Sequence, residues 1–288
     1  MDKHNFSGFI WSPGTPFKMN ILEKINETNP VLHIYDYYFK EQTTFEESIL
    51  KIYTTGDISQ DKIKNINLKN MVSHSFSFTY FKFYIAEPNT VEKIESNIME
   101  TYKKKMSNYI HDDIIYISNN LEQTKQIEII MNKYDNFKII QFVNTKYLLK
   151  LNIDRADILV RKYTLENYLK DKNYKFSFYN LMQSKRLSFD SSYCEKQFKT
   201  LINNVVSNGF DFKSEIKCNK DYFLHDGSHR IAICYFLNIP FIPIKLSTSR
   251  YKKIYNIDWF LNNNFSIEHI NIIQNEYIKL KSYLTDIE

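Results

Sequence analysis

The stretch DYFLHDGSHRIAICYFLNIPFIPIKL, residues 221 to 246, decides the fold of the second half of the chain. Gly227 is one of only five glycines, and it separates Asp226 from a Ser-His-Arg run that leads into an apolar segment. A glycine allows the positive φ of a sharp reversal and lets a ligand approach the backbone. The pattern therefore predicts a strand, a tight turn and a helix, with PFIPIKL as a closing strand.

The residues after this turn favour an anion. Ser228, His229 and Arg230 fall in the first turn of the helix, where free N–H groups and the positive end of the helix dipole attract negative charge. Arg230 can grip a phosphate with two donors, and His229 can donate a hydrogen bond or handle a proton. The alternative is structural: Asp226 and His229 form a local cap, Arg230 makes a surface ion pair, and Ser228 is a capping hydroxyl.

The segment before the turn has its own pattern. CEKQFKTLINNVVSNGF, residues 194 to 210, predicts an amphipathic helix that Gly209 ends. SEIKCNKDYFLHDG, residues 214 to 227, then predicts two short strands joined at Asn219–Lys220.

The order helix, glycine, strand, DG-x-HR, helix and IPFIPI resembles the core of the ParB/sulfiredoxin-like superfamily over about residues 157 to 246. That superfamily includes nucleotide-dependent DNA clamps, sulfiredoxins and free-serine kinases, and its loop before the helix binds nucleotide phosphates. The resemblance implies that Gly227, Ser228, His229 and Arg230 bind phosphate. It also implies an acidic role for Asp226, as a ligand of Mg²⁺ or as a catalytic carboxylate.

Differences between this chain and members of the superfamily narrow the range of functions that the resemblance implies. Sulfiredoxins carry a cysteine where this chain has Ser228, which counts against sulfinic-acid reduction. The partition proteins continue into a helix-turn-helix domain, whereas the roughly 40 residues after Leu246 predict one or two helices without a recognition-helix pattern. The kinases use a glutamate near the start of the earlier helix as a base, and Glu195 and Asp190 are the local candidates.

The first 150 residues alternate strand and helix patterns, which predicts a Rossmann-like α/β domain with a largely parallel sheet. Ligands of such sheets bind beyond the carboxyl ends of the strands, so Ser12–Thr15 and Ser118–Asn120 are either edges of one pocket or only turns and caps. His111–Asp113 is either a metal or acid–base group or a plain strand entry. We expect an α/β domain over residues 1–150, with substrate recognition as a candidate role, a ParB/sulfiredoxin-like domain over 151–250 and a helical extension over 251–288.

Composition limits the partners and the compartment. The net charge of +5 comes from 38 basic and 33 acidic residues without a long tract of one sign, which fits anionic small molecules and counts against nucleic acid without excluding it. Three cysteines, Cys194, Cys218 and Cys234, are too few for a disulfide framework and lack zinc spacing. No segment is apolar over the roughly 20 residues that span a bilayer, so we expect a cytoplasmic protein.

The sequence therefore predicts a nucleotide-dependent phosphotransferase that uses ATP or another nucleotide with Mg²⁺. Its acceptor would be a small hydroxyl-bearing molecule, such as a serine-like compound or a surface-glycan precursor. Asp226, His229 and Glu195 are the candidate catalytic residues, and a homodimer is compatible with the sequence. The alternative is a nucleotide-binding regulator, or a DNA-associated switch, that does not turn over.

Overall fold

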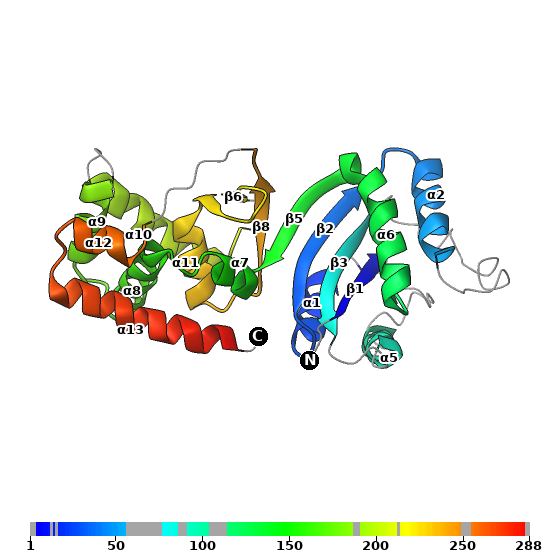
Figure 1. Cartoon of the computed structure of the whole chain (residues 1–288), viewed down its shortest axis with the longest axis horizontal. Coiled ribbons are helices and arrows are strands. Elements are labelled where there is room, and N and C mark those ends of the chain that lie inside the picture. The colour runs from blue at the N-terminus through cyan, green and yellow to red at the C-terminus, as the bar shows by residue number, and fades with distance from the viewer. Residues whose placement is uncertain are drawn as a thin grey trace. The chain divides into compact units, whose positions relative to one another are not determined.

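A computed structural model describes residues 4–11, 14, 17–55, 77–85, 91–103, 114–186, 191–211, 214–248 and 255–285. The chain is mixed α/β and divides into two compact units, Met1–Phe142 and Val143–Glu288 (Figure 1). The helices of residues 255–285, which we expected as a separate extension, belong to the second unit and share its core.

The first unit follows the alternation that its sequence predicts. Aromatic and β-branched residues fill its strands, and the helices between them carry one apolar face. Its elements are β1 (His4–Trp11), α1 (Lys18–Asn26), β2 (Val31–Tyr38), α2 (Gln42–Tyr53), β3 (Ser77–Ile85), α5 (Val91–Lys103), β4 (Ile115–Ile117), α6 (Leu121–Lys133), a 3-10 turn at Asp135–Phe137 and β5 (Lys138–Asn144), the last of which leads into the second unit.

The sheet of the first unit has the order β4-β1-β3-β2-β5. β3 is antiparallel to both β1 and β2, and β4 is antiparallel to β1. β1 and β2 thus run the same way, joined through α1, with β3 inserted between them as a split β-α-β unit. The expected largely parallel, Rossmann-like sheet is therefore wrong. The alternation of strands and helices predicts that β1 and β2 are joined through a helix. It does not predict that a later strand, β3, lies between them in the sheet.

The core of the first unit is aromatic. Phe9 and Trp11 lie on one face of β1 and stack at 5.2 Å between ring centroids, and Phe78 of β3 meets both edge-on. Gly8 lies opposite Phe81 in the register, and a Cβ there would come within 2.2 Å of the Phe81 ring. The glycine thus makes room for an aromatic ring across the strand pair.

The second unit combines a small sheet with a helical layer. Its elements are α7 (Thr145–Leu151), α8 (Ala156–Lys170), α9 (Ser177–Arg186), α10 (Ser191–Asn208), β6 (Ile216–Cys218), β7 (Leu224–Asp226), α11 (Ser228–Phe236), β8 (Phe241–Leu246), α12 (Ile257–Asn262) and α13 (Ile267–Leu284). β6 pairs with β7 antiparallel and with β8 parallel. α11 is the crossover between β7 and β8, and it lies between the strands and the other helices (Figure 1).

α8 is the central helix of this unit and is buried along most of its length. It packs against α11, so the apolar sides of both helices form one core with the helices of the chain's end. Asp157, Arg161 and Lys162 are also buried in it, and buried charges need partners. Those partners bring the α11 turn and α9 together.

Several smaller expectations can be compared with the structure. Asn120 caps α6, because its side chain accepts a hydrogen bond of 2.8 Å from the N–H of Gln123, as the turn-and-cap interpretation predicts. All three cysteines are free thiols. Within the described residues, no helix is both long and apolar enough to cross a membrane. His111–Asp113, Asp190, and Ser12, Pro13 and Thr15 lie outside the described residues.

Candidate functional site

The turn between β7 and α11 has the predicted form. β7 ends at Asp226, Gly227 is left-handed with φ +97° and ψ 17°, and α11 begins at Ser228. A Cβ on Gly227 would lie 2.8 Å from the side chain of Ile216. The backbone angle and this contact both require glycine. The space beside its Cα is filled by Ile216, so close approach of a ligand is not needed to explain the residue.

The N-terminus of α11 is open. No side chain caps it, and its first turn contains no acidic residue. The carboxylate of Asp226 accepts a 2.7 Å hydrogen bond from the N–H of Gly227. The N–H groups of Ser228, His229 and Arg230 have no acceptor among the described residues. Unsatisfied donors at the positive end of a helix dipole form a site for an oxyanion.

Ser228 points inward. Its Oγ accepts a 2.9 Å hydrogen bond from Nη2 of Arg155, and Nη1 of the same arginine donates to the carbonyl of Leu224 at 2.9 Å. Ser228 is buried and is the first residue of the helix, so its hydroxyl is not the predicted cap. The reason is that Gly227 takes the cap position, and the Ser228 side chain then satisfies a buried guanidinium instead. Only the N–H of Ser228 remains open to a ligand.

Most of the donors of the Arg230 guanidinium already have partners within the protein, so few remain to bind a phosphate. Its Nη1 donates to Oγ of Ser214 at 2.9 Å and to the carbonyl of Glu215 at 2.6 Å, and its Nη2 lies 3.3 Å from Oδ2 of Asp226. The Asp226 side chain is 62% exposed, whereas that of Arg230 is 17% exposed. The ion pair between Arg230 and Asp226 is therefore present, as the structural alternative for this turn predicts. Nε and one Nη2 hydrogen of Arg230 are left for a ligand.

His229 lies on the inner side of the same helical turn. Its ring packs 4.6 Å from the ring of Phe198, and its Nε2 is 2.7 Å from the hydroxyl of Tyr179. Burial, together with the nearby guanidinium groups of Arg161 and Arg186, holds the pKa of His229 well below its ordinary value of 6.5. The imidazole is therefore neutral at pH 7, and which nitrogen carries its proton depends on Tyr179.

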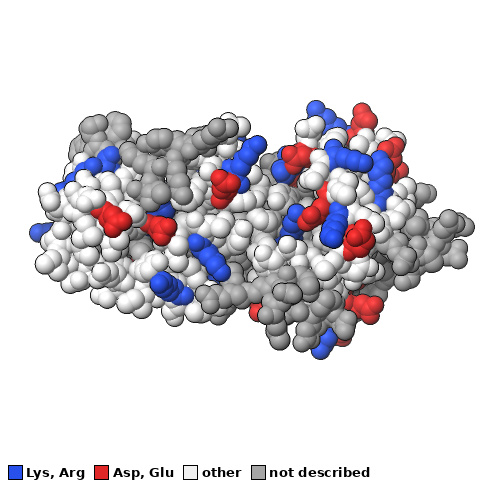
Figure 2. All heavy atoms as spheres, viewed as in Figure 1, with Lys and Arg blue, Asp and Glu red and all other residues white. Residues whose placement is uncertain are grey.

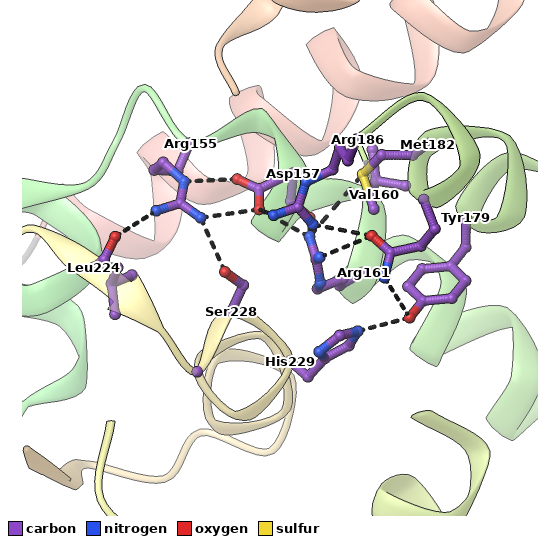
Figure 3. Close-up of polar contacts among 12 residues, drawn as sticks. Arg155, Asp157, Val160, Arg161, Tyr179, Met182, Arg186, Leu224, Ser228 and His229 are labelled. Atoms are coloured by element: carbon purple, nitrogen blue, oxygen red, sulfur yellow. Dashed lines mark hydrogen bonds and ion pairs between the residues drawn. The ribbon is translucent and has the colours of Figure 1, made fainter. Parts of the chain in front are cut away.

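Gln183 fixes the direction of the hydrogen bonds at Tyr179, whose contact with His229 is drawn in Figure 3. Its Oε1 lies 3.3 Å from Nη2 of Arg161 and 3.0 Å from Nη1 of Arg186. A guanidinium only donates, so this amide atom must be the oxygen. Nε2 of Gln183 then faces the Tyr179 hydroxyl at 3.1 Å and donates to it.

The Tyr179 hydroxyl accepts from Gln183, so its single proton is free to be donated elsewhere. Two acceptors are within reach, Nε2 of His229 at 2.7 Å and the carbonyl of Cys194 at 3.3 Å. The shorter contact indicates that the proton goes to His229. Nε2 is then an acceptor, so neutral His229 carries its proton on Nδ1. Nδ1 has no partner within the described part of the chain, and as an N–H it is a donor suited to an anion.

A buried carboxylate holds this network in place. Asp157 has no exposed surface and accepts bidentate hydrogen bonds of 2.7 and 3.0 Å from Arg155. Arg161 donates to it at 2.9 Å, and Nη2 of Arg186 lies 3.6 Å away. Burial alone would raise the pKa of Asp157, but Arg155 and Arg161 reverse that effect and hold the pKa far below its ordinary value.

The charges of this cluster do not balance. Three guanidiniums, from Arg155, Arg161 and Arg186, meet one carboxylate, that of Asp157, among the described residues. Burial and Arg186 lower the pKa of Arg161 to about 10, which leaves it charged at pH 7. An excess of positive charge therefore lies behind the open turn of α11. Sequence reasoning missed it, although RADILVR, residues 155 to 161, carries a signal in its three charges within an otherwise apolar stretch.

Glu195 belongs to a different set of contacts. It lies on α10, and its carboxylate accepts hydrogen bonds from Lys199 at 2.6 Å and from Asn180. Burial raises the pKa of Glu195, but these two hydrogen bonds outweigh it and keep the pKa below its ordinary value. The carbonyl of its chain neighbour Cys194 lies 3.3 Å from the Tyr179 hydroxyl, which in turn contacts His229 of α11. Glu195 is thus an ionised carboxylate that already accepts hydrogen bonds from two side chains.

Asp226 is the acidic residue that the structure leaves accessible at this turn. The described residues contain no group of three or more histidine, cysteine, aspartate or glutamate side chains that could hold a metal ion. Any divalent ion here would need ligands beyond Asp226, and nucleotide phosphates commonly supply them to Mg²⁺.

Comparison with known proteins adds no family to this geometry. A scan against protein-family models and a search of curated proteins both gave no match for the chain.

Proposed function

We propose that the α11 turn binds the phosphates of a nucleotide, ATP or a related one, and that the protein is a phosphotransferase of the ParB/sulfiredoxin-like type. The observation that carries the proposal is the open N-terminus of α11, with three free N–H groups at Ser228–Arg230, in front of a buried cluster with excess positive charge. A bound phosphate would satisfy those donors and offset that charge. The DGSHR sequence supports the same ligand by resemblance.

Each side chain has a distinct part in this proposal. The N–H groups of Ser228, His229 and Arg230 bind phosphate oxygens, and Nδ1–H of His229 adds a side-chain donor. Arg230 contributes its two remaining donors while its other hydrogen bonds hold it to Ser214 and Glu215, just before β6. His229 therefore acts as a neutral donor and not as a general base, which differs from the proton-handling role that its type suggests.

Asp226 is the residue that we assign to the transfer itself. The hydroxyl oxygen of the acceptor forms a bond to the γ-phosphorus, the bond from that phosphorus to the bridging oxygen breaks, and the nucleoside diphosphate leaves. The hydroxyl proton passes to the exposed carboxylate of Asp226. Mg²⁺, held by Asp226 and phosphate oxygens, would supply charge neutralisation when bound. We keep a small hydroxyl-bearing molecule, serine-like or a glycan precursor, as the acceptor class.

Two experiments, first on nucleotide binding and then on turnover, test this proposal. Thermal unfolding is followed with ATP, GTP and CTP, each with and without Mg²⁺, because a ligand at 100 times its dissociation constant stabilises a protein by about 2.7 kcal/mol. Nucleotide consumption is then measured against amino acids, amino alcohols and sugar phosphates. Stabilisation by a nucleotide and acceptor-dependent consumption are expected. The absence of any nucleotide effect would overturn the proposal.

A regulator without turnover is the second candidate. It is favoured by one observation: Glu195, one of the carboxylates considered as a base, already accepts hydrogen bonds from Lys199 and Asn180. On the face that Figure 2 shows, basic and acidic side chains of the described residues are interspersed, so this face does not present the continuous basic patch typical of a DNA-binding surface. Tight nucleotide binding without consumption by any acceptor would favour this candidate, and salt-dependent DNA binding would favour its DNA-associated form.

A further inference from the structure

A cavity lies in the second unit, bounded by the turn before α8, the start of α12 and one side of α13. Its volume is about 520 Å³, within the range of small-molecule pockets. The residues that line it are mostly apolar, and they are Ile153, Asp154, Ala156, Leu159, Asn256, Ile257, Asp258, Ile273, Gln274, Tyr277 and Ile278. None of them belongs to the α11 turn.

The inner wall of the cavity is part of the core. Ala156, Leu159 and Ile273 are at most 4% exposed, so their apolar surfaces are fixed by packing behind them. At the outer edge Ile278 of α13 is 66% exposed. The cavity thus offers a rigid apolar wall and an apolar edge, which suits a ligand with a hydrocarbon body.

The charged groups of the cavity are all acidic. Asp154 and Asp258 are both exposed, and neither makes an ion pair within the described residues. Asp258 only approaches Nδ2 of Asn256 at 3.4 Å, a long contact, while Asn256 uses its Oδ1 to cap α12. No described lysine, arginine or histidine lines the cavity. Outside the lining, Lys281 lies over the Tyr277 ring at 4.7 Å.

We propose that this cavity binds an organic cation with an apolar body, such as an alkylamine or an arylalkylamine. The hydrocarbon part would pack on Ala156, Leu159 and Ile273, and the ammonium group would donate to the carboxylates of Asp154 and Asp258. Those carboxylates have no cation of their own, so the ligand supplies the missing charge. Tyr277 is not assigned to the ammonium, since Lys281 already occupies a face of its ring. This site is independent of nucleotide binding at α11.

Matched probes separate charge from hydrophobic contact. Binding of hexylamine, hexan-1-ol and hexanoate is measured by calorimetry and thermal unfolding at pH 7 on the full chain. We expect hexylamine to bind at least tenfold more tightly than hexanol, and hexanoate to bind most weakly. Equal binding of the three probes, or binding of none, would overturn the proposal.

Two variants locate the site. Asp154→Asn combined with Asp258→Asn should weaken hexylamine at least tenfold and leave hexanol unchanged, whereas Asp221→Asn, an exposed aspartate outside the cavity, should change neither. Gln274→Trp, at an exposed lining position, should block every probe. Unaltered hexylamine affinity in the folded double variant would place the binding elsewhere and contradict the assignment. Because nucleotide affinity is measured on the same variants, failure of the α11 proposal would be seen separately.

Discussion

The hydroxyl of Tyr179 lies 2.7 Å from Nε2 of His229, and it is the donor of the pair. That direction follows from Gln183, whose oxygen is held by two guanidiniums and whose amide nitrogen therefore faces the tyrosine. A residue of α9 thus sets the tautomer of a histidine on α11. The arrangement leaves His229 neutral, with its proton on Nδ1 as a hydrogen-bond donor.

The tautomer itself is the first prediction. In ¹⁵N NMR spectra of the ligand-free protein, His229 is expected to carry its proton on Nδ1 at pH 7, with Nε2 unprotonated. Its resonances should not titrate near 6.5, since burial and two guanidiniums lower its pKa. A proton on Nε2 would show that the Tyr179 proton goes to the Cys194 carbonyl instead, and it would remove the side-chain donor from the site.

Tyr179→Phe tests the hydrogen bond. The change leaves Nε2 of His229 and Nε2 of Gln183 without their shared partner, and an unsatisfied buried polar group costs about 1–3 kcal/mol. Unfolding by urea should show a loss of that size, and NMR should show a mixture of His229 tautomers. Tyr193→Phe, at a tyrosine that is 62% exposed on α10, is the matched control and should alter neither. A variant as stable as the wild type would mean that the contact is unimportant.

Protonation of His229 gives a pH dependence of stability. The folded pKa lies below that of the unfolded chain, so the unfolded state binds more protons below pH 6.5, and the free energy of unfolding must fall as the pH falls. Tyr179, Arg186, Phe198, Arg161, Asp157 and Arg230 are the groups that face or influence the ring. Urea unfolding at pH 7.5 and 5.5 should therefore show a smaller loss for His229→Gln than for the wild type.

The comparison with His229→Gln is needed because protonation of His33 also lowers the stability of the folded protein at acidic pH. Burial also lowers the pKa of His33, to about 4, so the wild type loses stability on acidification through both residues. An equal loss in the wild type and in His229→Gln would contradict a buried, neutral His229.

Asp157→Asn is expected to be the most damaging single change in the network. It leaves Arg155, Arg161 and Arg186 without their carboxylate, and breaking a buried ion pair costs about 3–5 kcal/mol. Urea unfolding measures the loss. Glu27→Gln, which breaks an exposed pair with Lys24, is the control and should change little. A small effect of Asp157→Asn would mean that the guanidiniums are compensated by other groups.

A comparison of Gly227→Ala with Gly209→Ala separates the cost of a strained backbone from the cost of a steric clash. Gly209 at the end of α10 has a similar φ of +79°, but a Cβ there would meet nothing within 4 Å, whereas at Gly227 it would meet Ile216. Both alanine variants should be destabilised by the left-handed conformation, by about 1 kcal/mol, and Gly227→Ala should lose clearly more. Equal losses in chemical denaturation would show that Ile216 moves aside without penalty.

Local patterns in the sequence predicted the elements that local forces determine. The helix that ends before Gly209, the two short strands on either side of Asn219–Lys220 and the turn at Asp226–Arg230 all follow from apolar periodicity, turn residues and glycines. The insertion of β3 between β1 and β2 could not be predicted, since strand order depends on contacts far apart in sequence. The site network was missed for the same reason: Arg155 and Ser228 are 73 positions apart.

The backbone amides of Ser228, His229 and Arg230 provide the most direct test of the central claim that the α11 turn binds nucleotide phosphate. ATP with Mg²⁺ is titrated into ¹⁵N-labelled protein, and the amide shifts are compared with those of Glu268 and His269 at the start of α13, where Ser266 caps the helix. The account predicts large, saturable shifts at the three α11 amides and none at α13. Saturable nucleotide binding that leaves the α11 amides unmoved would contradict it.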